Sequence, residues 1–244
     1  MIAQQPEGGD VVAALPVVRL PVIGGGTFPV HRVYCVGRNF ADHAREMGAP
    51  VAESPADRGT PVFFLKPVDA LTLASDVPYP PGTRDLHHEV ELVVALGTDA
   101  PIGVLPVQDA ESLVFGYTVG LDLTRRDLQA AAKAKGLPWD TGKAFDSSAP
   151  VAPLVRRDEV GPLDTRRLTL RVNGELRQLG SFADMVWSVP EILHELSKLY
   201  ALRAGDIVFM GTPAGVGPLE VGDSFEAMVD GVASRCGRIA AAVC

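Results

Sequence analysis

The chain has 244 residues, of which 47% are hydrophobic and 21% charged, and its formal net charge at pH 7 is -8. This length is sufficient to bury a sizeable core, and the acidic balance argues against a general nucleic-acid or anionic-membrane binder, which would need basic surface patches. The three cysteines, Cys35, Cys236 and Cys244, show no CxxC spacing, so neither a disulfide framework nor a thiolate zinc site is expected.

The first 30 residues are rich in proline and glycine and are expected to form an arm laid over the core. The amino terminus lacks the basic and apolar regions of a secretory signal. The apolar run 11–26 cannot cross a bilayer as a helix, because Pro16, Arg19, Pro21 and three glycines interrupt it. We therefore expect a cytoplasmic protein with no membrane or nucleic-acid partner, in which residues 31–244 form a single domain.

Apolar alternation, turn residues and capping residues predict a mixture of strands and helices. In chain order the predicted elements are a strand at 31–36, a helix capped by Asn39 and ended by Gly48, a buried strand at 62–66, a proline-rich loop at 77–85, a strand at 87–97, a short helix at 108–113, a strand at 114–122 and a helix at 124–135. They continue with a hairpin over 167–178 turning at Asn173-Gly174, a helix opened by a capping box at Ser188 and Glu191 and carrying Ile192, Leu193, Leu196 and Leu199, a strand at 206–210 and a last hairpin turning at Asp230-Gly231.

The first candidate functional pair lies on the short helix after the first strand. His43 and Glu46 are three residues apart and therefore share one helical face. A carboxylate in that position can orient an imidazole and raise its basicity, as a water-activating base requires. An ordinary solvated pair on a surface helix has the same spacing, so the alternative stays open. Together with the polar segment 51–60, the helix could form a lid.

The segment 87–97 reads HHEVELVVALG and contains two glutamates at the start of an apolar run. Glu89 and Glu91 share one face of the predicted strand, and both faces become apolar further along, so the strand is expected to be buried on both sides. Two buried carboxylates repel each other and lose hydration, so a cation must compensate. A hard divalent ion, Mg²⁺, Mn²⁺ or Ca²⁺, prefers such oxygens. Alternatively, the strand end opens to solvent and the glutamates pair with arginine or lysine.

A third carboxylate ends the next strand. Asp122 closes the apolar run 114–122 and is well placed to be a third oxygen ligand. The alternative is that Asp122 or Thr124 caps the following helix, a common role for either residue.

Further polar groups follow these carboxylates along the chain. Arg126 and Gln129 are three apart on the helix at 124–135 and could face the same site. Lys143 could be a cation on the substrate side, although a lone lysine is usually solvated. The glycines of the loop 211–217 would let backbone N–H groups approach an anion, but the loop lacks the lysine and spacing of a phosphate loop.

Several of these segments resemble, in the same order, the fumarylacetoacetate hydrolase family over about residues 28–240. They are YCVGRNFADH, LHHEVEL, GLDLTRRDLQ, GLPWDTGKAFD, VNGELRQ and GDIVFMGTPAGVG. Within the family, the chain is most similar to the single-domain acylpyruvate hydrolases. Two departures are Phe40, where close relatives carry tyrosine, and Thr141, where a small or apolar residue is more usual.

The resemblance implies an α+β fold, a mixed β-sheet roll with flanking helices, and a homodimer. It implies Mg²⁺ or Mn²⁺ held at the positions of Glu89, Glu91 and Asp122, with His43 and Glu46 as a water-activating pair on a lid. It also implies that five further residues lie near substrate or the developing charge, namely Lys143, Gln129, Thr212, Arg38 and Arg126.

The activity implied by the resemblance is hydrolysis of a C–C bond in a 2,4-diketo acid. The expected substrate is 3-fumarylpyruvate, split into fumarate and pyruvate in gentisate catabolism. Alternatives are acetylpyruvate hydrolysis, oxaloacetate decarboxylation, isomerisation of a 2-hydroxydienedioate and, as a different class, a noncatalytic metal-dependent binding protein.

Overall fold

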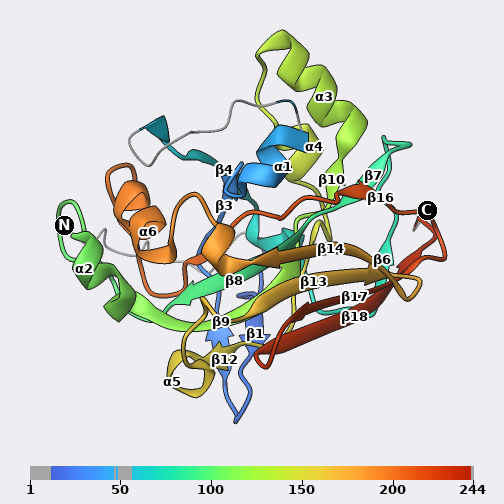
Figure 1. Ribbon diagram of the computed structural model, residues 1–244. Coiled ribbons are helices and arrows are strands. Elements are labelled where there is room, and N and C mark those ends of the chain that lie inside the picture. The colour runs from blue at the N-terminus through green and yellow to red at the C-terminus, as the bar shows by residue number, and fades with distance from the viewer. Residues whose placement is uncertain (1–11, 47, 49–56, 243–244) are drawn as a thin grey trace.

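The computed structural model describes residues 12–46, 48 and 57–242 (Figure 1). Most of the connection predicted over 51–60 lies outside these residues, and so does the start of the expected N-terminal arm. Among the helices described, none combines the length and apolar character that crossing a membrane requires.

Within the described residues, the strands form two larger sheets and three small ones. The six-stranded sheet has the order β12 (Val155–Arg156), β9 (Val114–Leu121), β8 (Val90–Leu96), β15 (Ile207–Phe209), β3 (Val33–Gly37) and β4 (Val62–Lys66). The five-stranded sheet has the order β14 (Glu175–Ser181), β13 (Arg167–Val172), β17 (Ser224–Val229), β18 (Ala233–Ala240) and β6 (Asp76–Pro78). The small sheets are β10 (Thr124–Arg125), β7 (Leu86–His88) and β16 (Gly217–Pro218), then β1 (Arg19–Pro21) with β2 (Thr27–Pro29), and β11 (Ala149–Pro150) with β5 (Leu71–Thr72).

The helices are short and flank these sheets (Figure 1). They are α1 (Ala41–Glu46), α2 (Val107–Ala110), α3 (Arg126–Lys135), α4 (Asp140–Lys143), α5 (Arg157–Val160) and α6 (Val189–Ser197), with single 3₁₀ turns η2 (Val68–Ala70), η3 (Glu111–Leu113) and η4 (Phe182–Asp184). Figure 1 shows α1, α3 and α4 together on the side away from β17 and β18. The mixed sheets with flanking helices confirm the α+β prediction.

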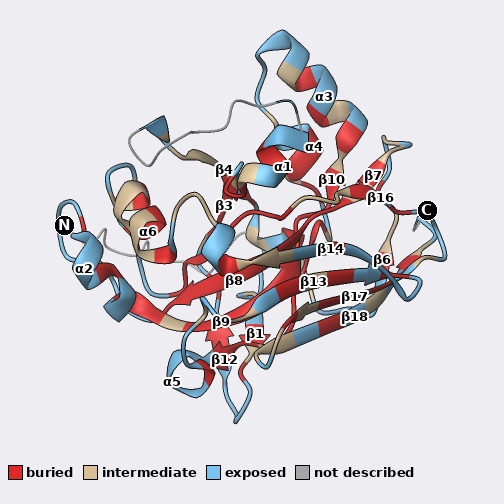
Figure 2. Cartoon of the chain, in the orientation of Figure 1, coloured by how far each residue is buried: buried red, intermediate tan, exposed pale blue. Residues whose placement is uncertain are grey.

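Strand β8 is the centre of the core. All seven of its residues are buried, as Figure 2 shows, which confirms the prediction of a strand covered on both faces. Val90 and Leu92 pack with residues of β13 and β17, in the core between the two larger sheets. Val93 and Ala95 pack in a second cluster on the opposite face, where Leu20 and other side chains of the N-terminal segment cover the sheet.

Local patterns located most elements correctly. The hairpin β13–β14 turns at Asn173-Gly174, where φ is +51° and +82°, the left-handed backbone that a two-residue hairpin turn needs. The capping box of α6 is present, because Glu191 accepts hydrogen bonds from the Ser188 backbone N–H and hydroxyl. Leu199, however, lies beyond the end of α6 and is exposed, so the prediction that the helix carries it was wrong.

Three predictions about elements were wrong because the outcome depends on distant strands. Strand β4 is only half-buried, since it forms the edge of the six-stranded sheet and Lys66 is its one buried residue. Part of the predicted loop 77–85 is strand β6, which pairs with β18 from the far end of the chain. Thr124–Arg125 forms strand β10 rather than the first turn of α3.

Asn39 does not cap the helix that follows it. Its side chain instead accepts a hydrogen bond from the Trp187 backbone N–H and donates to the carbonyls of Trp187 and Met210. These contacts tie the segment between β3 and α1 to the end of β15. The helix itself spans Ala41–Glu46, and Gly48 follows it with φ at +65°.

Candidate active site

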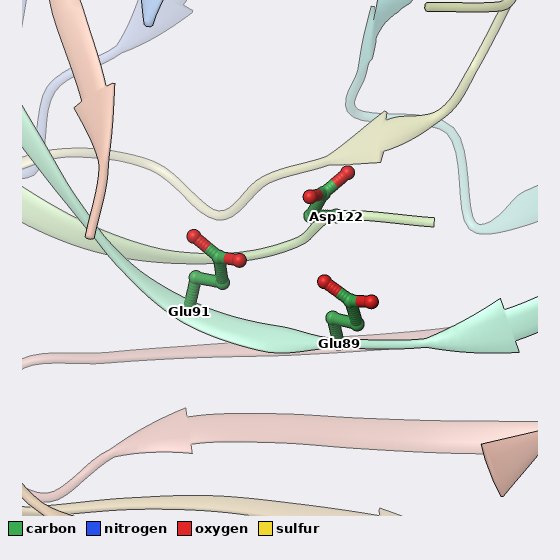
Figure 3. A group of neighbouring side chains, drawn as sticks. All are labelled: Glu89, Glu91 and Asp122. Atoms are coloured by element: carbon green, nitrogen blue, oxygen red, sulfur yellow. The ribbon is translucent and has the colours of Figure 1, made fainter. Parts of the chain in front are cut away.

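Three carboxylates meet where β8 begins and β9 ends (Figure 3). Glu89 lies between β7 and β8, Glu91 lies on β8, and Asp122 follows β9. All three are buried, and each offers a carboxylate oxygen within 4.8 Å of the others. The backbone joins the two strands at this point, because the Asp122 N–H donates to the Glu89 carbonyl at 2.8 Å. The structure therefore brings the predicted ligands together.

Two of these carboxylates are paired with buried cations. Lys143, on α4, donates to Glu89 at 2.7 Å and to Asp122 at 2.5 Å, while Arg126, on α3, donates to Glu89 at 2.5 Å. Burial opposes the ammonium form of Lys143, but Asp122 and Glu89 outweigh it and raise its pKa. Burial likewise opposes ionised Glu89, but Lys143 and Arg126 hold its pKa well below the usual range. Lys143 is thus a buried, paired cation rather than the solvated lysine of the alternative.

The other role considered for Asp122, capping α3, is excluded by its contacts. One of its oxygens accepts from Lys143, and the other lies 2.9 Å from the Lys66 ammonium without hydrogen-bond geometry. Residue Arg125 precedes α3, and no side chain caps that end.

Glu91 lacks such compensation. In the described part of the chain it forms no ion pair, and its hydrogen bond comes from the backbone N–H of Gly211 at 2.7 Å. Burial and the neighbouring charges of Asp122 and Glu89 raise the pKa of Glu91 well above its usual value. A divalent cation would remove this penalty, because three converging carboxylates are the donor set that hard cations prefer. The residues present therefore fit a bound Mg²⁺ or Mn²⁺.

His43 and Glu46 lie on α1, and His43 lines the cavity that contains the three carboxylates. His43 Nδ1 lies 3.4 Å from a Glu46 carboxylate oxygen, and the imidazole is buried. Burial lowers the pKa of His43, although Glu89 and Glu46 act in the opposite direction. The ring is therefore neutral at pH 7, and donation of the Nδ1 proton to Glu46 leaves Nε2 as a proton acceptor. The imidazole is therefore not the solvated group of the alternative, whereas Glu46 is exposed.

The loop 211–217 that follows β15, here called the glycine loop, contacts the carboxylates of Glu91 and Glu46. The Gly211 N–H donates to Glu91, and the Gly215 N–H lies 3.2 Å from both oxygens of Glu46. Both glycines have positive φ, at +88° and +93°. The backbone N–H groups of this loop thus contact carboxyl side chains of the site itself.

A polar chain orients Thr212 in this loop. The Gln178 amide nitrogen donates to the Thr212 hydroxyl oxygen at 2.8 Å and to the Pro213 carbonyl. The Gln178 amide oxygen accepts from the Val90 N–H and lies 2.9 Å from Nδ1 of buried His88, whose pKa burial lowers to about 4. Because Gln178 donates to Thr212, the hydroxyl proton of Thr212 is left to donate into the cavity.

The cavity has a volume of about 160 Å³ and is lined by α1, α3, α4, β8 and the glycine loop. Its lining includes all the residues predicted to be catalytic, substrate-binding or metal-binding except Glu46, which contacts the cavity residue His43. Gln129 is buried and accepts from Arg126 at 2.6 Å, so its amide nitrogen is available to a ligand. Neither Phe40 nor Thr141 lines this cavity.

Sequence reasoning missed three polar residues of the site. Lys66 supports Asp122, Gln178 orients Thr212, and Lys133 lines the cavity. A lysine that ends an apolar strand is a signal comparable to Asp122 and could have identified Lys66. Gln178 carries no local signal, because its partners come from β8 and from the loop after β15.

Comparisons with known proteins agree with this geometry. The family model described as fumarylacetoacetate hydrolase C-terminal matches residues 32–241. The mitochondrial oxaloacetate tautomerase of Mus musculus is 44% identical over 203 residues, covering 83% of this chain and 88% of the relative. An oxaloacetate tautomerase of Escherichia coli is 41% identical over 206 residues, covering 84% and 90%.

A solved structure is also similar over almost the whole chain. It is the fumarylpyruvate hydrolase of Pseudomonas aeruginosa in complex with Mn²⁺ and pyruvate, at 43% identity and a TM-score of 0.89, covering 96% of this chain and 100% of that one. The order of motifs, the fold and these matches agree, and the chain belongs to the fumarylacetoacetate hydrolase family.

Proposed function

We propose that this enzyme hydrolyses 3-fumarylpyruvate to fumarate and pyruvate, with Glu89, Glu91 and Asp122 holding Mg²⁺ or Mn²⁺. The observation that carries the proposal is that buried His43, with Nδ1 3.4 Å from a Glu46 oxygen, lies on the wall of the cavity that contains the three carboxylates. A base and an ion site that face the same small cavity suit a reaction that makes hydroxide from water and releases an enolate.

The proposed steps use His43 as the base and water as the nucleophile. Nε2 of His43 takes a proton from water, and the hydroxide adds to the C4 carbonyl of the substrate. The tetrahedral oxyanion collapses to a carboxylic acid, the C3–C4 bond breaks, and its electron pair remains on the pyruvate fragment as an enolate. The proton held by His43 then returns to C3, giving pyruvate.

The cations of the site oppose the negative charge that develops. Glu89, Glu91 and Asp122 would hold the divalent ion, which would supply Lewis-acid chemistry. The Lys143 ammonium is buried and fixed by Glu89 and Asp122, so it adds positive charge without rearrangement. The amide nitrogen of Gln129 and the hydroxyl of Thr212 offer donors to substrate oxygens. Arg126 offsets the charge of Glu89 from a second direction.

The test is the turnover of purified His43→Ala protein with fumarylpyruvate. We expect a loss of about 10²–10⁴-fold, the usual contribution of a positioned base, while Mn²⁺ binding measured by calorimetry is retained. Asp42→Asn is the matched control, because Asp42 is exposed on the same helix and pairs with Arg45 outside the cavity. Unchanged turnover in His43→Ala would remove the proposed base, and full activity in excess EDTA would remove the metal.

A second candidate is the keto–enol tautomerisation of oxaloacetate, favoured by the relatives that are 41–44% identical and carry that activity in their names. The same base would move a proton at C3 without breaking a C–C bond. Parallel incubation with fumarylpyruvate, acetylpyruvate and oxaloacetate, with products identified by mass, separates the candidates. Hydrolysis adds one water and decarboxylation loses CO₂. Tautomerisation or isomerisation leaves the mass unchanged and is detected instead by the change in ultraviolet absorbance of the enol or diene. The gentisate pathway, the homodimer, the cytoplasmic location and the domain division remain predictions.

A further inference from the structure

Two cations of the cavity wall differ from the others. Arg38 and Lys133 both line the cavity, yet neither side chain makes an ion pair or hydrogen bond with any residue among 12–46, 48 and 57–242. Arg126 and Lys143, by contrast, are bound to Glu89. The cavity therefore presents positive charge that its own carboxylates leave uncompensated.

Helix α3 sets the distance between Lys133 and the carboxylate cluster, which is formed by Glu89, Glu91 and Asp122. Arg126, Gln129 and Lys133 are spaced by three and four residues on α3, so they share the face directed at the cavity. Arg126 contacts Glu89, and Lys133 lies two turns further on, roughly 10 Å along the helix axis. A ligand that reaches both the carboxylate cluster and Lys133 must be elongated.

The surroundings of Lys133 favour a bound anion. Its pKa is lowered, first by burial and then by the like charges of Arg126 and Arg38. Its ammonium lies 5.1 Å from the centroid of the Trp139 ring, which packs against Phe64 with centroids 6.0 Å apart. A carboxylate bound by Lys133 and Arg38 would reduce their mutual repulsion, and the rings of Trp139 and Phe64 provide an apolar wall for a hydrocarbon segment.

Arg38 is held in place at a conformational cost. Its φ of +62° is in the left-handed region, which costs a residue with a side chain about 1–2 kcal/mol. The three hydrogen bonds of the adjacent Asn39 fix the chain there. Strain that neighbouring contacts impose is a recurrent feature of ligand sites.

We propose that Lys133, assisted by Arg38, binds the terminal carboxylate of an elongated dicarboxylic substrate whose 2-keto acid end occupies the carboxylate cluster. The inference rests on the proposed function for the placement of the 2-keto acid end. Lys133 is then a specificity residue: it favours fumarylpyruvate over acetylpyruvate, whose methyl group offers it no charge.

The test uses two ligands that differ only at the distal end. They are 2-oxoheptanedioate and 2-oxoheptanoate, which have the same chain length as fumarylpyruvate and lack the C4 carbonyl that hydrolysis needs. Calorimetry with the Mn²⁺-loaded protein should show the diacid binding about tenfold more tightly, equivalent to about 1.4 kcal/mol. Equal affinities for the wild-type protein would overturn the proposal.

Three variants locate the effect. Lys133→Met should bring the two affinities close together, while Lys133→Arg, which retains the charge, should keep the preference for the diacid. Lys135→Met is the matched control, because Lys135 is exposed on the same helix and does not line the cavity. Retention of the full preference in Lys133→Met, or its loss in Lys135→Met, would refute the role of Lys133. Unchanged binding of 2-oxoheptanoate by Lys133→Met shows that the site is intact.

A kinetic measurement separates this inference from the proposed function. If the enzyme hydrolyses both acylpyruvates, Lys133→Met should raise the ratio of KM for fumarylpyruvate to KM for acetylpyruvate about tenfold. If wild-type protein hydrolyses neither, the proposed hydrolysis fails, and the calorimetric comparison still decides whether Lys133 binds a distal carboxylate.

Discussion

His43 and Lys143 line the same cavity and are both buried, yet their pKa values shift in opposite directions. Desolvation disfavours both the imidazolium of His43 and the ammonium of Lys143. Lys143 contacts two carboxylates directly and stays charged, whereas His43 has only the longer contact to Glu46 and loses its proton. A fixed cation and a neutral base therefore coexist in one small space at neutral pH, as the proposed reaction requires.

The first prediction concerns the pH dependence of His43. Its pKa is below the ordinary 6.5, so the base is free at pH 7 and is lost as pH falls through the lowered value. We expect kcat/KM to be constant near pH 7 and to decline on an acidic limb whose midpoint lies below 6.5. Glu46→Gln removes a contact that raises the His43 pKa, so this limb should move to still lower pH while the plateau drops. A midpoint above 6.5 would contradict the assignment.

The second prediction concerns Gln178, which we regard as a positioning residue. Gln178→Leu removes the donor that directs the Thr212 hydroxyl, and kcat/KM should fall about tenfold, the value of roughly one hydrogen bond. In a Thr212→Val background the same change should have little further effect on kcat/KM, because the oriented hydroxyl is already absent. Equal losses in both backgrounds would indicate a purely structural role.

At the scale of elements, patterns within one segment could be predicted and pairings between distant segments could not. The alternation in β8 and the Asn173-Gly174 turn are local, and both were located from the sequence. Strand β6 exists because β18 lies beside it, and the half-buried state of β4 follows from its edge position. The same limit applies to the site: its ligands lie in recognisable motifs, while Lys66 and Gln178 act through contacts from other elements.

The third prediction concerns the turn that follows β15. Gly211 has φ at +88°, and a Cβ there would lie 2.8 Å from Asn39 Cβ, so Gly211→Ala must shift the turn and its N–H away from Glu91. We expect a stability loss of about 2 kcal/mol or more and weaker Mn²⁺ binding. Gly136→Ala is the control, because φ is +63° but the added Cβ meets nothing within 4 Å. It should lose about 1–2 kcal/mol and leave Mn²⁺ affinity unchanged; unaltered Mn²⁺ affinity in Gly211→Ala would refute the link to Glu91.

At the scale of the whole molecule, the site lies where the chain leaves one sheet and enters another. Glu89 occupies the point between β7, in the three-stranded sheet, and β8, in the six-stranded sheet. Asp122 marks the corresponding point between β9 and β10. An ion held there connects both sheets, and through Lys143 and Arg126 its ligands also contact α4 and α3.

This arrangement predicts that the metal stabilises the whole fold. At an Mn²⁺ concentration about 100 times its Kd, binding should add about 2.7 kcal/mol to the free energy of unfolding, and at roughly 2–4 °C per kcal/mol the Tm should rise by about 5–10 °C. Glu91→Gln should abolish most of this rise, because it removes the carboxylate whose ionised form is disfavoured until a cation binds. Glu226→Gln, an exposed change on β17, should keep it. A calorimetric scan with and without Mn²⁺ measures the effect, and an equal rise in Glu91→Gln would place the stabilising ion elsewhere.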